Sequence, residues 1–253
     1  MDSLIKGVIA FACVFGAAMM GMSWRTRVSD ECQASESKDV VRLVMGLVVT
    51  TVAITLGLLV GSAKSFYDTQ NAEMAQLAAN YVLLDRMLAE YGPEANDTRA
   101  ALRSVLAGDI EARDHLLGTS KLYDQLKSGE MVGKSIVDKI HALSPKDDDQ
   151  RFFKQQSLGL EVQLGQLRWL MYEQNTVPFP GFLLVILVAW LTMLFASFGI
   201  FAPRNLLVLL AFLASAVAVC GAIFLILQMY HPQRGLIRVS DAPLRAAMQQ
   251  LGR

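Results

Sequence analysis

The chain has 253 residues, 53% hydrophobic and 18% charged, and its 23 Lys and Arg residues balance 23 Asp and Glu residues. Soluble domains carry about 25% charged residues, so this composition predicts a membrane protein. A formal net charge of zero gives no indication of nucleic-acid binding. The three histidines lie far apart in the sequence and predict no metal site, and the three cysteines imply no disulfide framework.

Four uncharged apolar runs have the length of membrane-spanning helices. A helix rises 1.5 Å per residue, so about 20 residues cross a hydrocarbon core of about 30 Å. The first run also fits a signal peptide, because Lys6 precedes it and small residues lie near its end. Trp24, followed by two arginines, favours a retained span with an interfacial anchor. The runs are Gly7–Trp24, Leu43–Ala63, Phe182–Phe201 and Leu206–Tyr230.

The polar block between the second and third runs has a helical pattern. Apolar residues recur three or four positions apart from Met74 to Tyr91, and Gly92–Pro93 predicts the end of that helix. Further helices are predicted at 97–117, 132–143 and 147–174, the last with an apolar side that includes Phe152 and Phe153. The tail predicts a short amphipathic helix capped by Ser240, which docks on the membrane surface or on the soluble domain.

The predicted fold class is therefore all-α, a polytopic membrane protein with four transmembrane helices and a helical domain inserted between the second and third. No helix breaker separates Leu43 from Tyr91, so one continuous helix is expected to leave the membrane and enter that domain. The alternative is a break near Ser62–Ser65. The predicted divisions are 1–63 and 181–230 in the membrane, 64–180 outside it, and a tail at 231–253.

Four spans place both termini and the inserted domain on one side of the membrane. That side holds 18 Lys and Arg residues and the other side holds five. Long domains contribute little to the positive-inside rule, so charge favours cytoplasmic termini only slightly.

Two pairs of small or polar residues stand out in the second run. Gly57 and Gly61 form a GxxxG motif, which in lipid lets two helix backbones approach closely, here either between subunits or against the small-residue-rich first span. Chance occurrence is the alternative. Thr51 and Thr55 lie on one face, where hydroxyls either line an aqueous path or bond back to carbonyls of their own helix.

The motifs that are missing limit the function classes. None of the four runs contains a charged residue, which argues against a proton-coupled transporter but not against a channel with a hydrophobic gate. No zincin, hydrolase, P-loop or dinucleotide-binding signature is present, so we expect neither an enzyme nor a cofactor. Asp147–Asp149 indicates a helix start rather than a metal site.

Four stretches resemble those of bacterial membrane proteins with a bestrophin-like domain: SAKSFYDTQ at Ser62–Gln70, LLDRMLAEYGPE at Leu83–Glu94, FASFGIFAPRN at Phe195–Asn205 and GLIRVSDAPLR at Gly235–Arg245. Bestrophins are pentameric anion channels in which the second of four spans lines the pore and a helical cytosolic part follows it. Their neck aromatics have no counterpart in Leu43–Ala63, and the tail has a single acid, Asp241, so calcium gating is not carried over.

The resemblance implies a homo-oligomer in the bacterial inner membrane, surrounded by lipid, with its termini and helical domain in the cytoplasm. The first hypothesis is an anion channel whose second span lines the pore. The second is a non-conducting scaffold or sensor whose helical domain binds a protein partner that the sequence does not identify.

Overall fold

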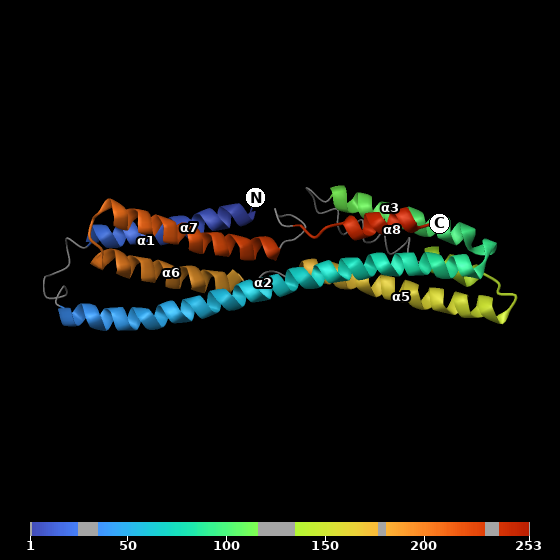
Figure 1. Ribbon diagram of the computed structural model, residues 1–253, viewed down its shortest axis with the longest axis horizontal. Helices are drawn as coiled ribbons and strands as arrows, with labels where there is room; N and C mark the ends of the chain where they lie inside the picture. The colour runs from blue at the N-terminus through green and yellow to red at the C-terminus, as the bar shows by residue number, and fades with distance from the viewer. Residues whose placement is uncertain (1, 25–34, 116–134, 177–180, 231–237, 253) are drawn as a thin grey trace. The chain divides into compact units, whose positions relative to one another are not determined.

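The computed structural model describes residues 2–24, 35–115, 135–176, 181–230 and 238–252. Every element of regular secondary structure in these ranges is a helix, which confirms the predicted all-α class (Figure 1). The chain divides into two compact units. The membrane unit comprises Met1–Phe66 and Pro178–His231, and the helical unit comprises Tyr67–Val177 and Pro232–Arg253.

Four helices of the described chain are long and apolar enough to cross a membrane, as predicted. The third and fourth match the predicted runs to within one residue, whereas the first begins five residues before Gly7 and the second eight residues before Leu43. The chain is therefore a multi-pass membrane protein. The four helices are α1 (Asp2–Trp24), α2 (Ser35–Tyr91), α6 (Gly181–Phe201) and α7 (Leu206–Met229).

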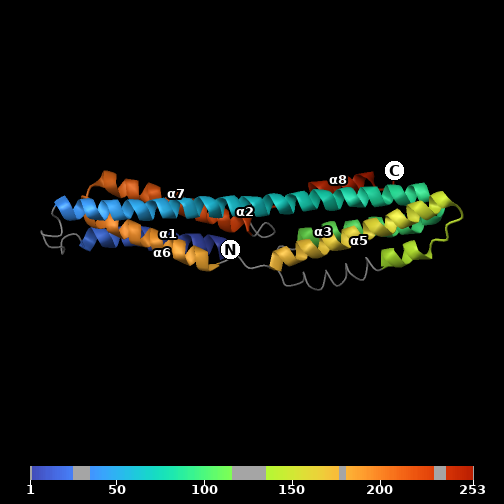
Figure 2. The ribbon, with the colours of Figure 1, turned by 90° about the horizontal axis from the view of Figure 1, so that it is seen from below.

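Helix α1 packs against α6 and α7 within the membrane unit (Figures 1 and 2). A Cβ at Gly21 would overlap the carbonyl oxygen of Ala196 and lie 3.2 Å from the Cα of Gly199. A Cβ at Gly199 would in turn overlap the carbonyl oxygen of Ala18. The two backbones touch because both helices carry glycine at the crossing, which is how helices associate in lipid. Most small residues of the first span thus pack among neighbouring helices, whereas Gly16 is exposed.

Helix α2 continues without interruption from Ser35 to Tyr91, so the predicted continuous helix is confirmed and the break near Ser62–Ser65 is wrong. The residue after this helix is Gly92, whose φ of 121° lies in the left-handed region that favours glycine. Gln150 holds this end in place, because its side-chain amide donates to the carbonyl oxygen of Tyr91 at 3.0 Å. Its own backbone N–H is capped by the Asp147 carboxylate at 2.7 Å.

The helical unit contains the second part of α2, a short 3-10 helix (Pro93–Ala95), α3 (Asn96–His115), a helical segment at 135–142, α5 (Asp148–Thr176) and α8 (Ala242–Gln250). In Figures 1 and 2, α3 and α5 lie beside the second part of α2. The predicted apolar stripe of α2 is buried in the core of this unit: Met74, Leu77, Tyr81, Leu84, Leu88 and Tyr91.

The predicted apolar side of α5 is wrong at one residue. Phe152 is 55% exposed, whereas Phe153 packs against the core. The buried side of α5 also contains two polar residues, Ser157 and Glu161, which lie on the same face as Leu160 and Leu164. The sequence also predicts a short extended hinge at 177–180, from Pro178 and Pro180, but these residues lie outside the described ones.

The tail helix α8 docks on the helical unit, so the alternative of docking on the membrane surface is not observed. Leu244, Ala247 and Leu251 are buried in the core of that unit, and Met248 packs against it. The N-cap is Asp241 rather than Ser240. Ser240 lies one residue too early, and its hydroxyl accepts the backbone N–H of Ala242 at 3.2 Å instead.

Candidate functional site

The membrane part of α2 is the candidate site, because its own chain covers it less than any other span. Only 11% of its most apolar stretch is buried within the chain, against 33% for α1, 28% for α6 and 17% for α7. The buried positions Val52, Leu59 and Ala63 lie on one narrow side that packs on the rest of the membrane unit. The other faces are free for lipid, for other subunits or for an aqueous path.

The two threonines lie toward the edge of the covered side. Thr51 is exposed and Thr55 is half-buried. The hydroxyl of Thr51 donates to the carbonyl oxygen of Leu47 at 3.0 Å, and that of Thr55 donates to the carbonyl oxygen of Thr51 at 2.8 Å. In this conformation each hydroxyl hydrogen is used by its own helix. What each side chain presents outward is a hydroxyl oxygen and a methyl group.

The two glycines lie on the uncovered side. Both are exposed, and a Cβ at Gly57 or Gly61 would meet none of the described atoms within 4 Å beyond its own stretch of helix. Within this chain, then, neither glycine contacts the first span. A contact between subunits stays a prediction.

The threonine pair and the glycine pair do not share a face of α2. At 3.6 residues per turn each residue advances about 100°, so members of either pair lie about 40° apart and the two pairs are about 120° apart. Thr50, whose hydroxyl donates to the carbonyl oxygen of Gly46 at 2.9 Å, lies near the glycine side. The structure therefore separates a threonine flank from a glycine flank.

A buried polar cluster in the helical unit was missed by sequence reasoning. It joins Tyr81 of α2, Asp109 of α3, and Glu161 and Arg168 of α5. The Tyr81 hydroxyl donates to Asp109 Oδ2 at 2.5 Å and accepts a hydrogen bond from Arg168 Nη2. Arg168 Nε lies 3.6 Å from Asp109 Oδ2, and Arg168 Nη1 lies 3.6 Å from Glu161 Oε1. One guanidinium thus faces two carboxyl groups and a phenol.

Burial controls the ionisation of this cluster. The Glu161 side chain is 3% exposed, and its Oε2 has no hydrogen-bond partner among the described residues. Burial raises the pKa of Glu161 to about 7, with Arg168 opposing and Asp109 reinforcing the rise. Burial and the charge of Asp109 also raise the pKa of Tyr81 above its usual range. Burial thus favours the neutral form of Glu161.

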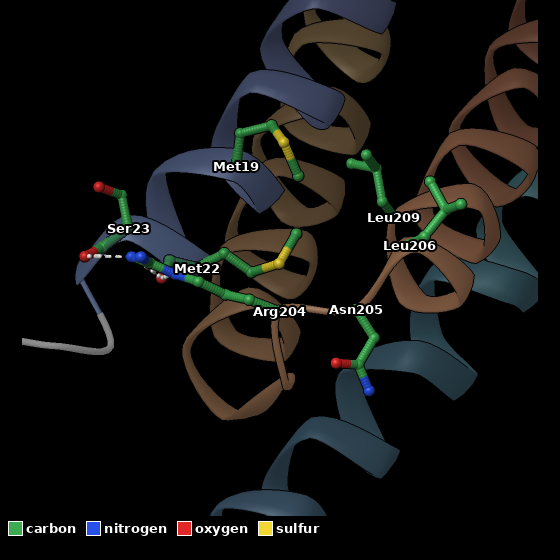
Figure 3. Close-up of a pocket in the computed structure, with 7 residues that line it drawn as sticks. All are labelled: Met19, Met22, Ser23, Arg204, Asn205, Leu206 and Leu209. Carbon is green, nitrogen blue, oxygen red and sulfur yellow. Dashed lines mark hydrogen bonds between the residues drawn. The ribbon is translucent and has the colours of Figure 1, made fainter.

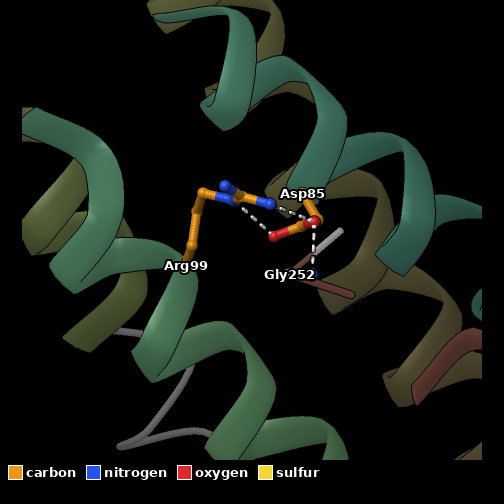
Figure 4. Close-up of polar contacts among 3 residues, drawn as sticks. All are labelled: Asp85, Arg99 and Gly252. Atoms are coloured by element: carbon orange, nitrogen blue, oxygen red, sulfur yellow. Dashed lines mark hydrogen bonds and ion pairs between the residues drawn. The ribbon is translucent and has the colours of Figure 1, made fainter. Parts of the chain in front are cut away.

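A second polar contact fixes the end of the tail (Figure 4). Arg99 of α3 donates to both carboxylate oxygens of Asp85 on α2, each at 2.8 Å, and the backbone N–H of Gly252 donates to the same carboxylate at 3.1 Å. Burial opposes ionisation, but the hydrogen bonds from Arg99 and Gly252 outweigh it and hold the pKa of Asp85 below its usual value. Asp85 therefore links α3 and the tail to α2 as a buried carboxylate.

A surface pocket of about 530 Å³ lies where α1 ends and α7 begins (Figure 3). Arg204, in the turn between α6 and α7, donates from Nη2 to the carbonyl oxygens of Met22 at 3.0 Å and Ser23 at 3.3 Å. The pocket is lined by Met19, Met22, Ser23, Arg204, Asn205, Leu206 and Leu209.

Over the described ranges, no group of three His, Cys, Asp or Glu side chains is placed to hold a metal ion.

Comparisons with known proteins agree with this arrangement. A crystal structure of a variant of a bacterial bestrophin homologue from Klebsiella pneumoniae matches with a TM-score of 0.70 at 14% identity, over 99% of this chain and 97% of that one. A second variant matches with a TM-score of 0.69 at 12% identity, over 99% and 98%. A crystal structure of a membrane protein matches with a TM-score of 0.69 at 12% identity, over 97% of each chain.

These likenesses show a shared fold. No curated protein matches the chain. The family model of the Bestrophin-like domain matches residues 10–244, which is most of the sequence. The chain therefore belongs to the bestrophin-like family.

Proposed function

We propose that the protein is the subunit of an oligomeric anion channel of the bacterial inner membrane, with α2 lining the pore. The observation that carries this proposal is the small covered fraction of α2 within its own chain. A span that is left open on most sides fits a place at the centre of an assembly. There the glycine flank meets neighbouring subunits and the threonine flank meets water. By analogy with bestrophins the assembly is a pentamer.

The charges at the two ends of the span favour anions. Arg42 and Lys64 are exposed and bracket the stretch 43–63, which contains no acidic residue. Rings of Arg or Lys side chains are the means by which pores favour anions. Asp39 lies 3.8 Å from Arg42 and reduces the field at that end. Thr51 and Thr55 offer hydroxyl donors to a passing anion once their side chains rotate away from the helix carbonyls.

The termini and the helical unit belong in the cytoplasm under this proposal. The support is the count of 18 basic residues against five, together with the layout of bestrophins. An Ala100→Cys thiol on the exposed side of α3 is expected to react with an impermeant reagent only after the cells are permeabilised. A Pro203→Cys thiol in the turn between α6 and α7 serves as the matched control and reacts in intact cells. The background lacks Cys13, Cys32 and Cys220.

Flux through liposomes tests conduction. The purified oligomer is expected to dissipate a chloride gradient, and a Thr51→Cys variant is expected to lose this flux when a water-soluble thiol reagent modifies it. Val52→Cys is the control, because Val52 is the adjacent residue and is buried within the chain. An assembled protein without flux above empty liposomes, over varied pH, salt and membrane tension, contradicts the channel.

That outcome favours the second candidate, a non-conducting scaffold or sensor whose helical unit binds a protein partner. One observation supports it: the hydroxyls of Thr50, Thr51 and Thr55 are all satisfied by carbonyls of their own helix. Under this alternative the centre of the assembly is packed or filled with lipid, and α2 serves only to join subunits.

A further inference from the structure

The residues that line the pocket between the end of α1 and the start of α7 change from polar to apolar with increasing depth in the membrane. Ser23, Arg204 and Asn205 lie at its outer end, where α1 stops at Trp24 and α7 begins. The deeper positions are apolar: Met19 is one helical turn further into α1, and Leu209 is one turn further into α7. The lining therefore changes from polar to apolar within one turn below the ends of two membrane spans.

Arg204 is held in place at the polar end. Its Nε and Nη2 donate to the carbonyl oxygen of Met22 at 3.3 and 3.0 Å, and Nη2 also reaches that of Ser23. These carbonyls belong to the last turn of α1, which has no helical partners for them. A guanidinium has five N–H donors, and Nη1 of Arg204 donates no hydrogen bond to the described residues. A cation is thus fixed at the rim with donors remaining.

The apolar wall suits a flexible chain. Met19 and Met22 are unbranched and polarisable, so they adapt to irregular contents. Leu206 remains 73% exposed beside them. The volume of about 530 Å³ lies within the range of small-molecule sites.

We propose that this pocket binds one anionic phospholipid per subunit. Its phosphate contacts Arg204, and one acyl chain lies against Met19, Met22 and Leu209. The planar guanidinium matches the geometry of a phosphate. The order of polar rim and apolar wall is the order of headgroup and tail in the bilayer, and a soluble anion would leave the apolar wall unfilled. The lipid would secure the ends of α1 and α7 independently of conduction.

Thermal unfolding of the purified, assembled protein in a neutral detergent provides the test. Phosphatidylglycerol is expected to raise Tm by several degrees more than phosphatidylcholine with the same acyl chains, and inorganic phosphate is expected to have no effect. Native mass spectrometry is expected to retain one phosphatidylglycerol per subunit. Equal stabilisation by the two lipids, or stabilisation by phosphate alone, overturns the proposal.

A matched pair of variants localises the effect. Leu209→Trp fills the pocket from α7 and is expected to abolish both the lipid-dependent rise in Tm and the retained lipid. Leu210→Trp is the control, because Leu210 is on the same helix, 54% exposed and outside the lining. An Arg204→Gln variant alone does not test lipid binding, because it also removes the hydrogen bonds from Arg204 to the last turn of α1. If Leu209→Trp keeps the lipid response, or changes only the oligomeric state, the pocket is not a lipid site.

Discussion

The two parts of α2 differ in how completely their own chain covers them. In the helical unit, Leu84 and Leu88 are fully buried, whereas Leu47 and Leu58 in the membrane unit are 70% exposed. Water drives the apolar side chains of the first kind together, at about 25 cal/mol per Å² buried. Lipid supplies no such force between helices, so leucines of the second kind can stay uncovered and association depends on packing. Different forces therefore determine which side chains of this one helix are buried in its two parts.

The same contrast separates two sets of glycines. Gly21 and Gly199 bring the backbones of α1 and α6 into contact inside the chain, whereas Gly57 and Gly61 face no described neighbour. The first contact is complete in one subunit. Under the proposed function, the second contact forms only when subunits assemble.

The largest expected effect comes from replacing a glycine of each set by leucine. Gly199→Leu places a side chain where even a Cβ would overlap the α1 backbone, so it should lower the free energy of unfolding by at least about 3 kcal/mol and prevent folding. Gly61→Leu should leave the monomer folded and disrupt only the oligomer. Size-exclusion chromatography and thermal unfolding in detergent distinguish the two results. A stable, fully assembled Gly61→Leu variant would show that the glycine flank faces lipid.

A truncation on each part of α2 measures the difference directly. Leu84→Ala opens a cavity in the helical unit and should destabilise it by about 2–5 kcal/mol. Leu58→Ala removes an exposed side chain and should change stability by less than about 0.5 kcal/mol. Denaturant unfolding followed by one probe in each unit provides the measurement. A comparable loss from Leu58→Ala would mean that this leucine is buried between subunits.

The elements of the fold were predictable because run length and periodicity report the local solvent. The spans, the continuous α2 and the buried stripe from Met74 to Tyr91 all follow from residues close in sequence. The exposure of Phe152 was not predictable from the sequence, because the side of α5 that is buried depends on the surfaces of α2 and α3 against which it packs. That side also contains Ser157 and Glu161.

The sites were predictable only in part. The glycines and threonines of α2 stand out by residue type, but their roles depend on surfaces outside the chain. The cluster around Arg168 could not be inferred, because Tyr81 and Asp109 come from other helices and sequence does not state which faces meet. One signal was present: Glu161 and Arg168, seven residues apart, share the side of α5 that carries Leu164.

The buried carboxyl group of Glu161 should make the stability of the helical unit depend on pH. Its pKa is raised from 4.5 to about 7, so between these values the folded state keeps a proton that the unfolded state has lost. The free energy of unfolding should therefore fall as pH rises, by about 1.4 kcal/mol per unit and about 3 kcal/mol in total, and level off above pH 7.

Glu161→Gln should remove this slope, because an amide does not titrate. Glu90→Gln, an exposed position on α2, is the control and should keep it. Thermal unfolding of each variant from pH 5 to pH 8 provides the comparison. An unchanged pH profile in Glu161→Gln would assign the dependence to another group.

The smallest expected effect concerns the tail, the last element that completes the helical unit. Gly252 has a φ of 88°, and a Cβ there would lie 3.3 Å from Arg103 Nη1. Gly252→Ala should therefore cost about 1 kcal/mol and weaken the N–H hydrogen bond to Asp85. Gly108→Ala is the matched control, because it lies inside α3 with open space around it and should stabilise that helix by up to about 1 kcal/mol.

Hydrogen exchange of α8 distinguishes a local effect from a global one. Because Leu244 and Leu251 remain in the core, we expect Gly252→Ala to speed exchange mainly in α8 and at the Asp85 contact, while the rest of the helical unit keeps its protection. Faster exchange spread evenly over α2, α3 and α5 would mean that the tail is part of a single cooperative core. No change in α8 would mean that the hydrogen bond of Gly252 to Asp85 contributes nothing to docking.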